Sequence, residues 1–410
     1  MLRKTRLALV AGAAFLAAAH FAAPTPARAE IPGNKIRLGV LTDLNGNGAD
    51  STGTGSVVSA RLAAEDFKKA HPGIEVEVIS LDHQNKPDVG SAAARKWVAD
   101  GTVDAILDVP FSSVALAVQE VVRGTNVAFI ASGPGTALLT GEKCSPNTVH
   151  WTYDTWALAH GTAAALLKAK KDTWFFVTAD YAFGHALEAD AMAVVKASPD
   201  GKVLGSVRHP PNASDFSSFI LQAQASGAQV VALANAVGDT INSVKAAAEF
   251  GLTQKQSLAA LLMQVTDVHS LGLPVAKGLF LTEGFYWNMN DGTRAYADRF
   301  AAQMNGRRPT ANQAGVYSGA LHYLRAAAAA NTTEGQKVVA KMKEMPSDDP
   351  LFGKGEVRAD GRHIHNMYLF QVKTPDQSKG PWDYYNLVET IPAKDAFRPM
   401  ADGKCPMVKG

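Results

Sequence analysis

The sequence predicts an α/β fold in which parallel sheets are covered by helices on both faces. Short runs of β-branched and apolar residues, such as Val230-Val231-Ala232-Leu233, alternate with longer amphipathic segments. Such continuous apolar runs are typical of parallel strands buried on both faces. The alternation reaches about residue 150 and restarts near Trp174. This restart predicts two similar lobes, as expected for a chain too long for a single hydrophobic core.

The first 29 residues predict a cleavable export signal. A positive start is followed by the apolar stretch 7–21 and by Ala27-Arg28-Ala29, an A-x-A pattern that places cleavage before Glu30. The stretch is shorter than the roughly 20 apolar residues that span a bilayer. We therefore favour a cleaved signal over a membrane anchor and predict a periplasmic protein.

The net charge gives no argument for a nucleic acid or an anionic membrane as a partner. The formal charge of the whole chain is +2. Residues 1–29 carry four positive side chains and no acid, so the predicted mature chain has a charge of −2. The apparent basicity belongs to the signal.

The predicted elements alternate along the mature chain. The predicted strands are 36–41, 74–80, 103–109, 127–131, 174–178, 203–208, 229–234, 258–263, 278–282 and 367–373. The predicted helices are 56–70, 91–100, 113–123, 155–170, 183–197, 215–226, 239–250, 293–304, 312–330 and 333–344. Repeated β-α-β units of this length imply right-handed crossovers.

The sequence contains only two cysteines, Cys144 and Cys405. An even count in an exported protein favours a disulfide, which would join the C-terminal tail to the middle of the chain. Two free buried thiols remain the alternative.

The glycine-rich loop 42–55 links the first predicted strand to the first helix. One interpretation is a dinucleotide-phosphate loop, with Asp82 as the ribose-binding acid. The G-x-G-x-x-G spacing fails, because Val58 stands where a third glycine is needed after Gly53 and Gly55. We therefore favour a loop that lines a cleft for another small ligand, and we predict no cofactor.

Two polar segments, 110–113 and 131–136, follow the third and fourth predicted strands. Both are expected at the carboxyl edge of a sheet, where open α/β folds bind ligands. Hydroxyls and unpaired N–H groups at a helix start can hold a carboxylate. Plain helix capping by Ser112 or Ser113 is the alternative, although two adjacent loops of this kind favour an anion site.

Aromatic residues gather after later strands, and we expect several of them to line the cleft rather than the core. They are Trp151, Tyr153, Trp156, Tyr181, Phe183, Phe285, Tyr286 and Trp287.

Signals for catalysis or metal binding are weak. No G-x-S-x-G elbow occurs, and neither cysteine lies in a nucleophile motif. His363 and His365 would share one face of a strand, but two histidines define no metal site. We predict that the protein is not an enzyme and holds no metal.

Several segments resemble the periplasmic solute-binding proteins of branched-chain amino-acid-type (Leu/Ile/Val-binding-like) ABC transporters. They are Ile36–Asp43, Thr178–Gly184, Lys245–Leu252 and Ala314–Leu321, in that order along the chain. The resemblance implies the type I fold, with two Rossmann-like lobes and three hinge crossovers near 151–154, 284–288 and 361–366. It places the first lobe at 30–152 and 287–362, the second at 153–286 and 363–374, and a tail packed on the lobes at 375–410.

The resemblance also implies the ligand-binding residues. In the family, hydroxyls and N–H groups of the first lobe hold the ligand carboxylate, and aromatic residues and the second lobe complete the site. The residues implied here are Asn45, Phe111, Ser112, Ser113, Ser132, Gly133, Gly135, Tyr153, Tyr181, Phe183, Asn235 and Gln264.

One departure from the family pattern bears on the ligand. Where amino-acid binders place an acid for the ligand ammonium, this chain has Leu262-Met263-Gln264-Val265. A buried ammonium without a partner is costly. We therefore favour an aromatic or 2-oxo acid over an amino acid. The alternatives are a binding protein for branched-chain or other amino acids and an exported α/β enzyme. The expected partners are a small ligand and an inner-membrane ABC permease, and the expected state is a monomer.

Overall fold

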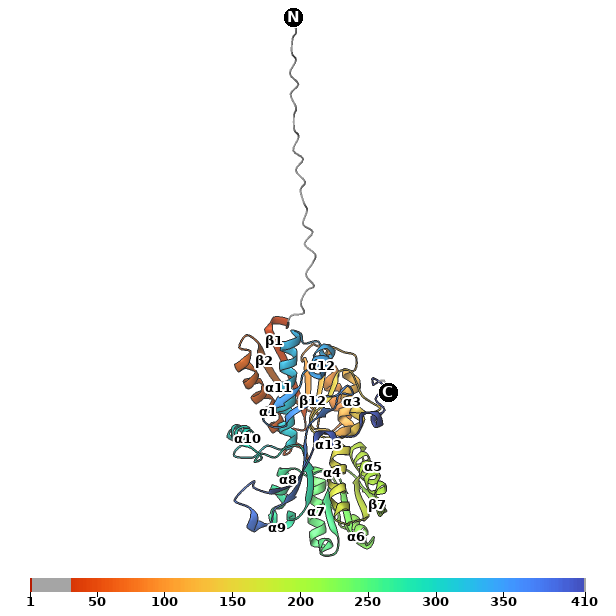
Figure 1. The fold of residues 1–410 in the computed structure, drawn as a ribbon. Helices are drawn as coiled ribbons and strands as arrows, with labels where there is room; N and C mark the ends of the chain where they lie inside the picture. The colour runs from red at the N-terminus through yellow and green to blue at the C-terminus, as the bar shows by residue number, and fades with distance from the viewer. Residues whose placement is uncertain (2–30, 409–410) are drawn as a thin grey trace.

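The computed structural model describes Met1 and residues 31–408, which form two stacked α/β lobes with the C-terminus beside the upper one (Figure 1). The predicted export signal, apart from Met1, lies outside the described residues. No helix in the described part of the chain is long and apolar enough to cross a membrane.

The first lobe is built on a five-stranded parallel sheet, sheet A, with the strand order β2-β1-β3-β4-β5. One face is covered by helices that include α1 and α11, and the other by α2 and α3, each with its own apolar core. The strands are β1 (Lys35–Thr42), β2 (Glu75–Asp82), β3 (Ala105–Asp108), β4 (Ala128–Ala131) and β5 (Thr148–His150). The helices are α1 (Gly53–Ala70), α2 (Pro87–Ala99), α3 (Ser112–Val122), α10 (Asp291–Gln303), α11 (Ala311–Ala330) and α12 (Gly335–Glu344).

The second lobe is built on a seven-stranded sheet, sheet B, with the order β15-β14-β10-β9-β8-β6-β7. Strands β6 to β10 are parallel, and β14 and β15 add an antiparallel edge. The strands are β6 (Thr173–Ala179), β7 (Lys202–His209), β8 (Val230–Ala234), β9 (Ser257–Ala260), β10 (Phe280–Glu283), β14 (Met367–Val372) and β15 (Tyr385–Ile391). The helices are α4 (Thr155–Lys168), α5 (Ala182–Ala197), α6 (Ser217–Ala225), α7 (Val237–Glu249), α8 (Val265–Leu271) and α9 (Leu273–Ala276).

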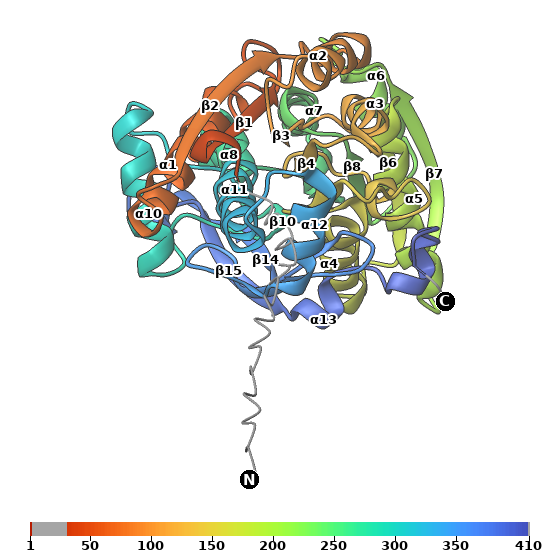
Figure 2. The same cartoon turned by 90° about the horizontal axis from the view of Figure 1, so that it is seen from above.

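The chain passes between the two sheets three times. It leaves β5 through residues 151–154 to α4, returns from β10 through 284–290 to α10, and crosses again between β13 (His363–Ile364) and β14. β13 belongs to a small sheet with β11 (Ser347–Asp349) and β12 (Gly353–Val357). The view from above shows the first lobe lying over the second (Figure 2). The positions of the domain boundaries stay a prediction.

A buried arginine holds the first and third crossovers together. The Arg362 side chain is fully buried and donates to the carbonyls of Trp151 (2.6 Å), Tyr153 (2.8 Å) and His363 (3.0 Å). Its guanidinium also lies 4.5 Å from the centre of the Phe397 ring. Each of these buried carbonyls would lose a donor without this side chain, so Arg362 satisfies the backbone where the chain is irregular.

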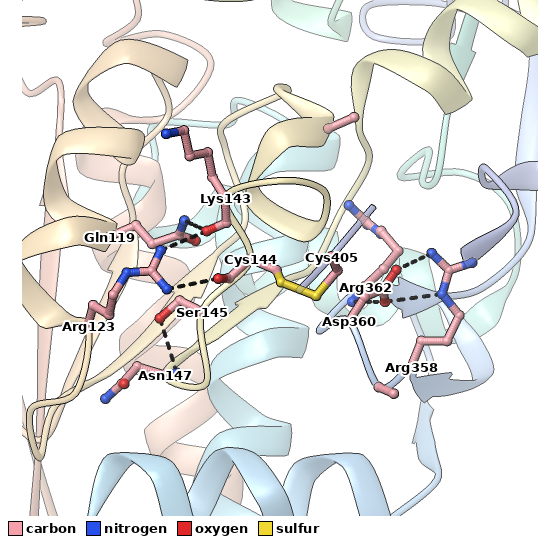
Figure 3. Close-up of a disulfide and its surroundings, with 12 residues drawn as sticks. Gln119, Arg123, Lys143, Cys144, Ser145, Asn147, Arg358, Asp360, Arg362 and Cys405 are labelled. Carbon is pink, nitrogen blue, oxygen red and sulfur yellow. Dashed lines mark hydrogen bonds and ion pairs between the residues drawn. A yellow bond between two sulfur atoms is a disulfide. The ribbon is translucent and has the colours of Figure 1, made fainter. Parts of the chain in front are cut away.

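The C-terminal segment contacts both lobes. β15 is the edge strand of sheet B, and Cys405 forms the predicted disulfide with Cys144 near sheet A, with a Cα–Cα distance of 5.6 Å. Figure 3 shows this bond and Arg123, which donates to the Cys144 carbonyl. The short helix α13 (Ala393–Ala396) lies between β15 and Cys405. The C-terminal segment, which begins in the second lobe, is therefore linked covalently to the first lobe.

The predicted fold class is confirmed, and the long elements lie where the sequence indicated. The sequence pattern failed to predict β5, β11 to β13 and β15, together with helices α8, α9 and α13. Most of these are two to four residues long, too short for a periodic pattern. β15 was missed because Leu387 and Val388, at 55% and 50% exposure, face solvent on consecutive positions instead of alternating with polar residues.

Candidate ligand-binding cleft

Two adjoining cavities lie between the carboxyl edges of the two sheets. The empty space of the inner cavity, open solvent included, is about 350 Å³, and that of the outer cavity is about 630 Å³. They share Phe111 from the first lobe and Tyr181, Ala236 and Val237 from the second. The inner cavity is lined by Gly48, Ser51, Thr52, Pro110, Phe111, Gly133, Gly135, Tyr153, Tyr181, Phe183, Ala236, Val237, Leu262 and Asn312.

Four aromatic rings make up much of the inner cavity wall. Phe111 precedes α3, Tyr153 lies in the first crossover, and Tyr181 and Phe183 lie at the start of α5. Tyr153 donates its hydroxyl hydrogen to the Gly133 carbonyl at 2.8 Å, and this bond fixes the orientation of the ring in the cavity wall. Burial raises the pKa of both Tyr153 and Tyr181, so both phenols stay neutral and can donate hydrogen bonds.

Two glycines let the backbone approach these rings. A Cβ added at Gly135 would lie 2.6 Å from the Phe183 ring, and one at Gly133 would lie 2.6 Å from Asp108 Oδ1 and Pro110 Cα. Any larger residue would push into the cavity wall or into β3. The two glycines therefore keep the space that a ligand would fill.

The start of α3 faces the inner cavity and carries no side-chain cap. Its N-cap residue is Phe111, whose ring lines both cavities. The first N–H groups of a helix have no partner within the helix and lie at the positive end of its dipole. The uncapped start of α3 thus lies beside the apolar rings of the inner cavity, whose lining contains no charged side chain.

Strained backbone flanks the cleft on both sides. Asp108 and Val109 have φ angles of +76° and +54° before α3, and Val237 has a φ of +50° at the start of α7. A β-branched residue at positive φ is a true outlier, and such strain concentrates at functional sites.

Two carboxyl groups lie close to the cavities. Asp108 is fully buried behind Gly133, and burial raises its pKa to about 6 even though the Ser132 hydroxyl donates to it at 3.4 Å. Asp239 lines the outer cavity and accepts a hydrogen bond from the Asn212 N–H at 3.1 Å. Burial also raises the pKa of Asp239 to about 6, and its Oδ1 has no hydrogen-bond partner.

One buried amide in the wall of the inner cavity is incompletely paired. Asn312, 5% exposed at the start of α11, has no partner for its Oδ1. Unpaired buried polar atoms are costly, so they mark places where a ligand or water is expected.

The structure brings together seven of the twelve residues predicted to bind the ligand. Six line the inner cavity and Ser113 lines the outer one. Ser112 and Ser132 are buried behind the wall, where Ser112 Oγ accepts from the Thr136 N–H. Three of the predicted residues, Asn45, Asn235 and Gln264, lie outside both linings. Asn45 donates to Asp82, and Asn235 is hydrogen-bonded to His209, Ser243 and Thr240. Gln264 accepts a hydrogen bond from the Ala311 N–H.

Several lining residues were missed by the sequence reasoning. Gly48, Ser51 and Thr52 belong to the glycine-rich loop that was singled out, but only its Asn45 was named. Asn312 enters from α11, more than 150 residues from the other first-lobe residues of the inner cavity. No local pattern indicates so distant a contact.

The two histidines considered for metal binding have structural partners. His365 Nε2 donates to the Thr152 carbonyl at 2.8 Å, and His363 shares a hydrogen bond with the Ser347 hydroxyl at 2.7 Å. Burial lowers the pKa of His365 to about 4, so it is neutral. Among residues 31–408, no group of three or more metal-ligating side chains is present.

A family model described as periplasmic binding protein matches residues 35–381. The chain belongs to this family. A periplasmic binding protein from Burkholderia mallei has a solved structure that is 47% identical, covers 92% of this chain and 100% of its own, and superposes with a TM-score of 0.89.

Two further relatives connect this periplasmic binding protein to branched-chain amino-acid-type transporters. A branched chain amino acid ABC transporter periplasmic ligand-binding protein from Burkholderia xenovorans is 39% identical over 91% of this chain and 99% of its own, with a TM-score of 0.82. The Leu/Ile/Val-binding protein homolog 6 of Brucella suis is 26% identical over 76% of this chain and 80% of its own. The predicted resemblance is therefore confirmed.

Family membership fixes the general role of the protein. Periplasmic binding proteins of ABC transporters bind small-molecule ligands, work with permeases, and act in the periplasm. They are binding proteins and not enzymes.

Proposed function

We propose that the cleft captures a small carboxylate that lacks an ammonium group, with aromatic or 2-oxo acids preferred, and closes on it for delivery to an ABC permease. The observation that carries this proposal is the lining of the inner cavity, where four aromatic rings lie beside the uncapped start of α3 and no charged side chain is present.

The uncharged lining favours a ligand with one negative and one apolar end. The start of α3 offers donors and a positive dipole end to a carboxylate, without a cationic side chain. Phe111, Tyr153, Tyr181 and Phe183 offer apolar surface to a ring or a short chain. An amino acid would place its ammonium among these groups with no acid in the same lining, which costs several kcal/mol.

Some structures with the same fold hold ligands of this class. A solute-binding protein from Rhodopseudomonas palustris was solved in complex with 4-hydroxybenzoate, and another in complex with 3,4-dihydroxy benzoic acid. They are 20% and 21% identical to this chain, so they show only that the fold accommodates aromatic acids.

Asp239 supports a second candidate, an amino acid that reaches into the outer cavity. Asp239 lines the outer cavity together with Tyr181 and Val237, and its Oδ1 has no hydrogen-bond partner. An ammonium placed there would find a partner.

A thermal-shift screen separates the two candidates. We expect 4-hydroxybenzoate, benzoate or a 2-oxo acid to raise the melting temperature, with a gain of about 2.7 kcal/mol at a hundred times the dissociation constant. Leucine and valine should give no shift. Stabilisation by amino acids alone, lost in Asp239→Asn, would support the second candidate. No shift with any of these compounds would contradict both ligand classes.

A further inference from the structure

Two side-chain amides, those of Asn47 and Gln264, make three hydrogen bonds between the two lobes. Asn47 lies in the glycine-rich loop of the first lobe, and Gln264 precedes α8 in the second lobe. Asn47 Oδ1 accepts from the Gly238 N–H of α7 at 3.1 Å. Gln264 Oε1 accepts from the Ala311 N–H of α11 at 3.1 Å. Each amide therefore reaches the first turn of a helix that belongs to the opposite lobe.

The start of α7 has no side-chain cap in its own lobe. Its N-cap residue is Ala236, which has no polar side chain, and no cap hydrogen bond is made from that position. Asp239, in the same first turn, accepts from the Asn212 N–H. The Gly238 N–H is one of the helix donors that require an outside acceptor. Asn47 supplies that acceptor from across the cleft.

Asn47 makes a second bond to the same lobe. Its Nδ2 donates to Asn212 Oδ1 at 3.0 Å, so the amide is held at both its oxygen and its nitrogen. Asn47, Asn212 and Asp239 all line the outer cavity. The contact thus lies at the mouth of the cleft.

At the start of α11, a helix of the first lobe, the acceptor comes from the second lobe. Thr310 and Gln313 form a capping box that serves the Gln313 N–H and the Thr310 N–H. The Ala311 N–H is left to Gln264, whose side chain is 2% exposed. This contact lies deep in the molecule, whereas the Asn47 contact is exposed.

We propose that Asn47 and Gln264 form a reciprocal clasp, in which each lobe caps a helix of the other when the cleft closes, and that this clasp sets the balance between open and closed forms. The inference rests on closure of the cleft as proposed above, but it does not depend on which ligand binds. Asn47 and Gln264 act here as positioning residues, because the proposed effect is on the arrangement of the lobes.

Gly238 offers a steric test of the clasp. A Cβ added at Gly238 would overlap Asn47 Oδ1, whereas its backbone is not in the left-handed region. Alanine is therefore acceptable to α7 itself and improves helix propensity. Gly238→Ala should disturb only the arrangement in which Asn47 reaches α7.

The experiment measures the distance between the lobes without ligand, by pulsed electron spin resonance. Spin labels on Ala92→Cys in α2 and Gln222→Cys in α6 report it, since both positions are exposed and the two helices lie on the same side in Figure 2. Asn47→Ala loses both hydrogen bonds of the amide, so the closed-to-open ratio is expected to fall about five- to a hundredfold. Gly238→Ala should lower it at least as much, and Gln264→Met should also lower it.

Two further variants make the result specific. Asn45→Ala removes a hydrogen bond to Asp82 within the first lobe and should leave the distance distribution unchanged. In Asn47→Ala/Gly238→Ala the overlap is gone, so its distribution should match that of Asn47→Ala alone. Unchanged distributions in Asn47→Ala and Gly238→Ala would overturn the clasp. So would a Gly238→Ala effect that adds fully to that of Asn47→Ala, because it would then arise within the second lobe.

Discussion

The hinge side and the cleft side of the molecule treat buried polar groups in different ways. At the hinge, all three nitrogens of the Arg362 guanidinium donate to backbone carbonyls, and His365 donates to a carbonyl of the first crossover. At the cleft, Asn312 Oδ1, Asp239 Oδ1 and Gln264 Nε2 have no partner. The contrast is one of degree, because Thr152 Oγ1 in the first crossover and Glu283 Oε1 beside the second also have no partner. The hinge carbonyls are paired by a buried cation, which favours one arrangement of the chain, whereas the unpaired amide and carboxyl atoms of the cleft can meet a ligand or the opposite lobe.

The largest expected effect tests the hinge side. Arg362→Met keeps much of the side-chain volume but removes a donor from each of three buried carbonyls, of which that of Trp151 keeps a contact with His363 Nδ1 at 3.3 Å. We expect a loss of about 3–5 kcal/mol in the free energy of unfolding, measured by urea denaturation. Arg299→Met is the matched control, because its side chain is 36% exposed and pairs with Glu65 and Asp66. That variant should lose no more than about 1 kcal/mol. Equal losses would contradict the account of the hinge.

The next effect concerns the covalent link between the tail and the first lobe. Cys144→Ser/Cys405→Ser opens a loop with a sequence separation of 261 residues. The expected destabilisation is about 2–4 kcal/mol, the usual range for a native disulfide. Urea denaturation of the oxidised wild type, the reduced wild type and the variant provides the measurement. If oxidised and reduced wild type unfold at the same urea concentration, the link contributes nothing to stability.

A third change tests the cleft side through its shape. Gly135→Ala places a methyl group 2.6 Å from the Phe183 ring, which must move into the inner cavity. Overpacking of this kind costs about 1–3 kcal/mol, so affinity for the best ligand of the screen should fall about tenfold or more. Gly73→Ala is the control, since a Cβ there meets nothing within 4 Å and the glycine is not at positive φ. Unchanged affinity in Gly135→Ala would place the ligand elsewhere.

A further expected effect is a pH dependence near the buried clasp residue Gln264. Burial raises the pKa of Asp267 from its usual 3.8 to about 7, and repulsion from Asp50 adds to the rise. The folded state therefore holds this proton more tightly than the unfolded state. The resulting stabilisation is complete below the unfolded pKa and is lost as the pH rises from about 4 to 7.

Asp267→Asn tests this sign. Its melting temperature should fall less than that of the wild type between pH 5 and pH 8, as measured by calorimetry. Asp402→Asn, at an exposed position, should follow the wild type. If the melting temperature of Asp267→Asn falls more steeply with rising pH than that of the wild type, the raised pKa of Asp267 is contradicted.

The sequence predicted most of the fold because its long elements carry their own periodicity. Val230–Ala234 is a continuous apolar run, and the structure buries every residue of it in the middle of sheet B. The hydroxyl-bearing strand β5 (Thr148–His150) has only three residues, so its place in sheet A depends on tertiary pairing with β4. Short strands of this kind cannot be predicted from local pattern.

The cleft was predictable only in part. Gly133, Gly135, Tyr181 and Phe183 follow strands, and the topology of parallel sheets brings such residues to one edge. The role of Gln264 as a cap for α11 depends on how the two lobes meet, which no residue spacing reveals. The residues between the lobes are therefore where sequence reasoning stops.

Calorimetric titration of the purified protein with 4-hydroxybenzoate and with leucine tests the proposed ligand class most directly. The uncharged, ring-lined inner cavity predicts saturable binding of one aromatic acid per chain and no measurable heat with leucine. Tight binding of leucine with no response to ammonium-free acids would contradict the account.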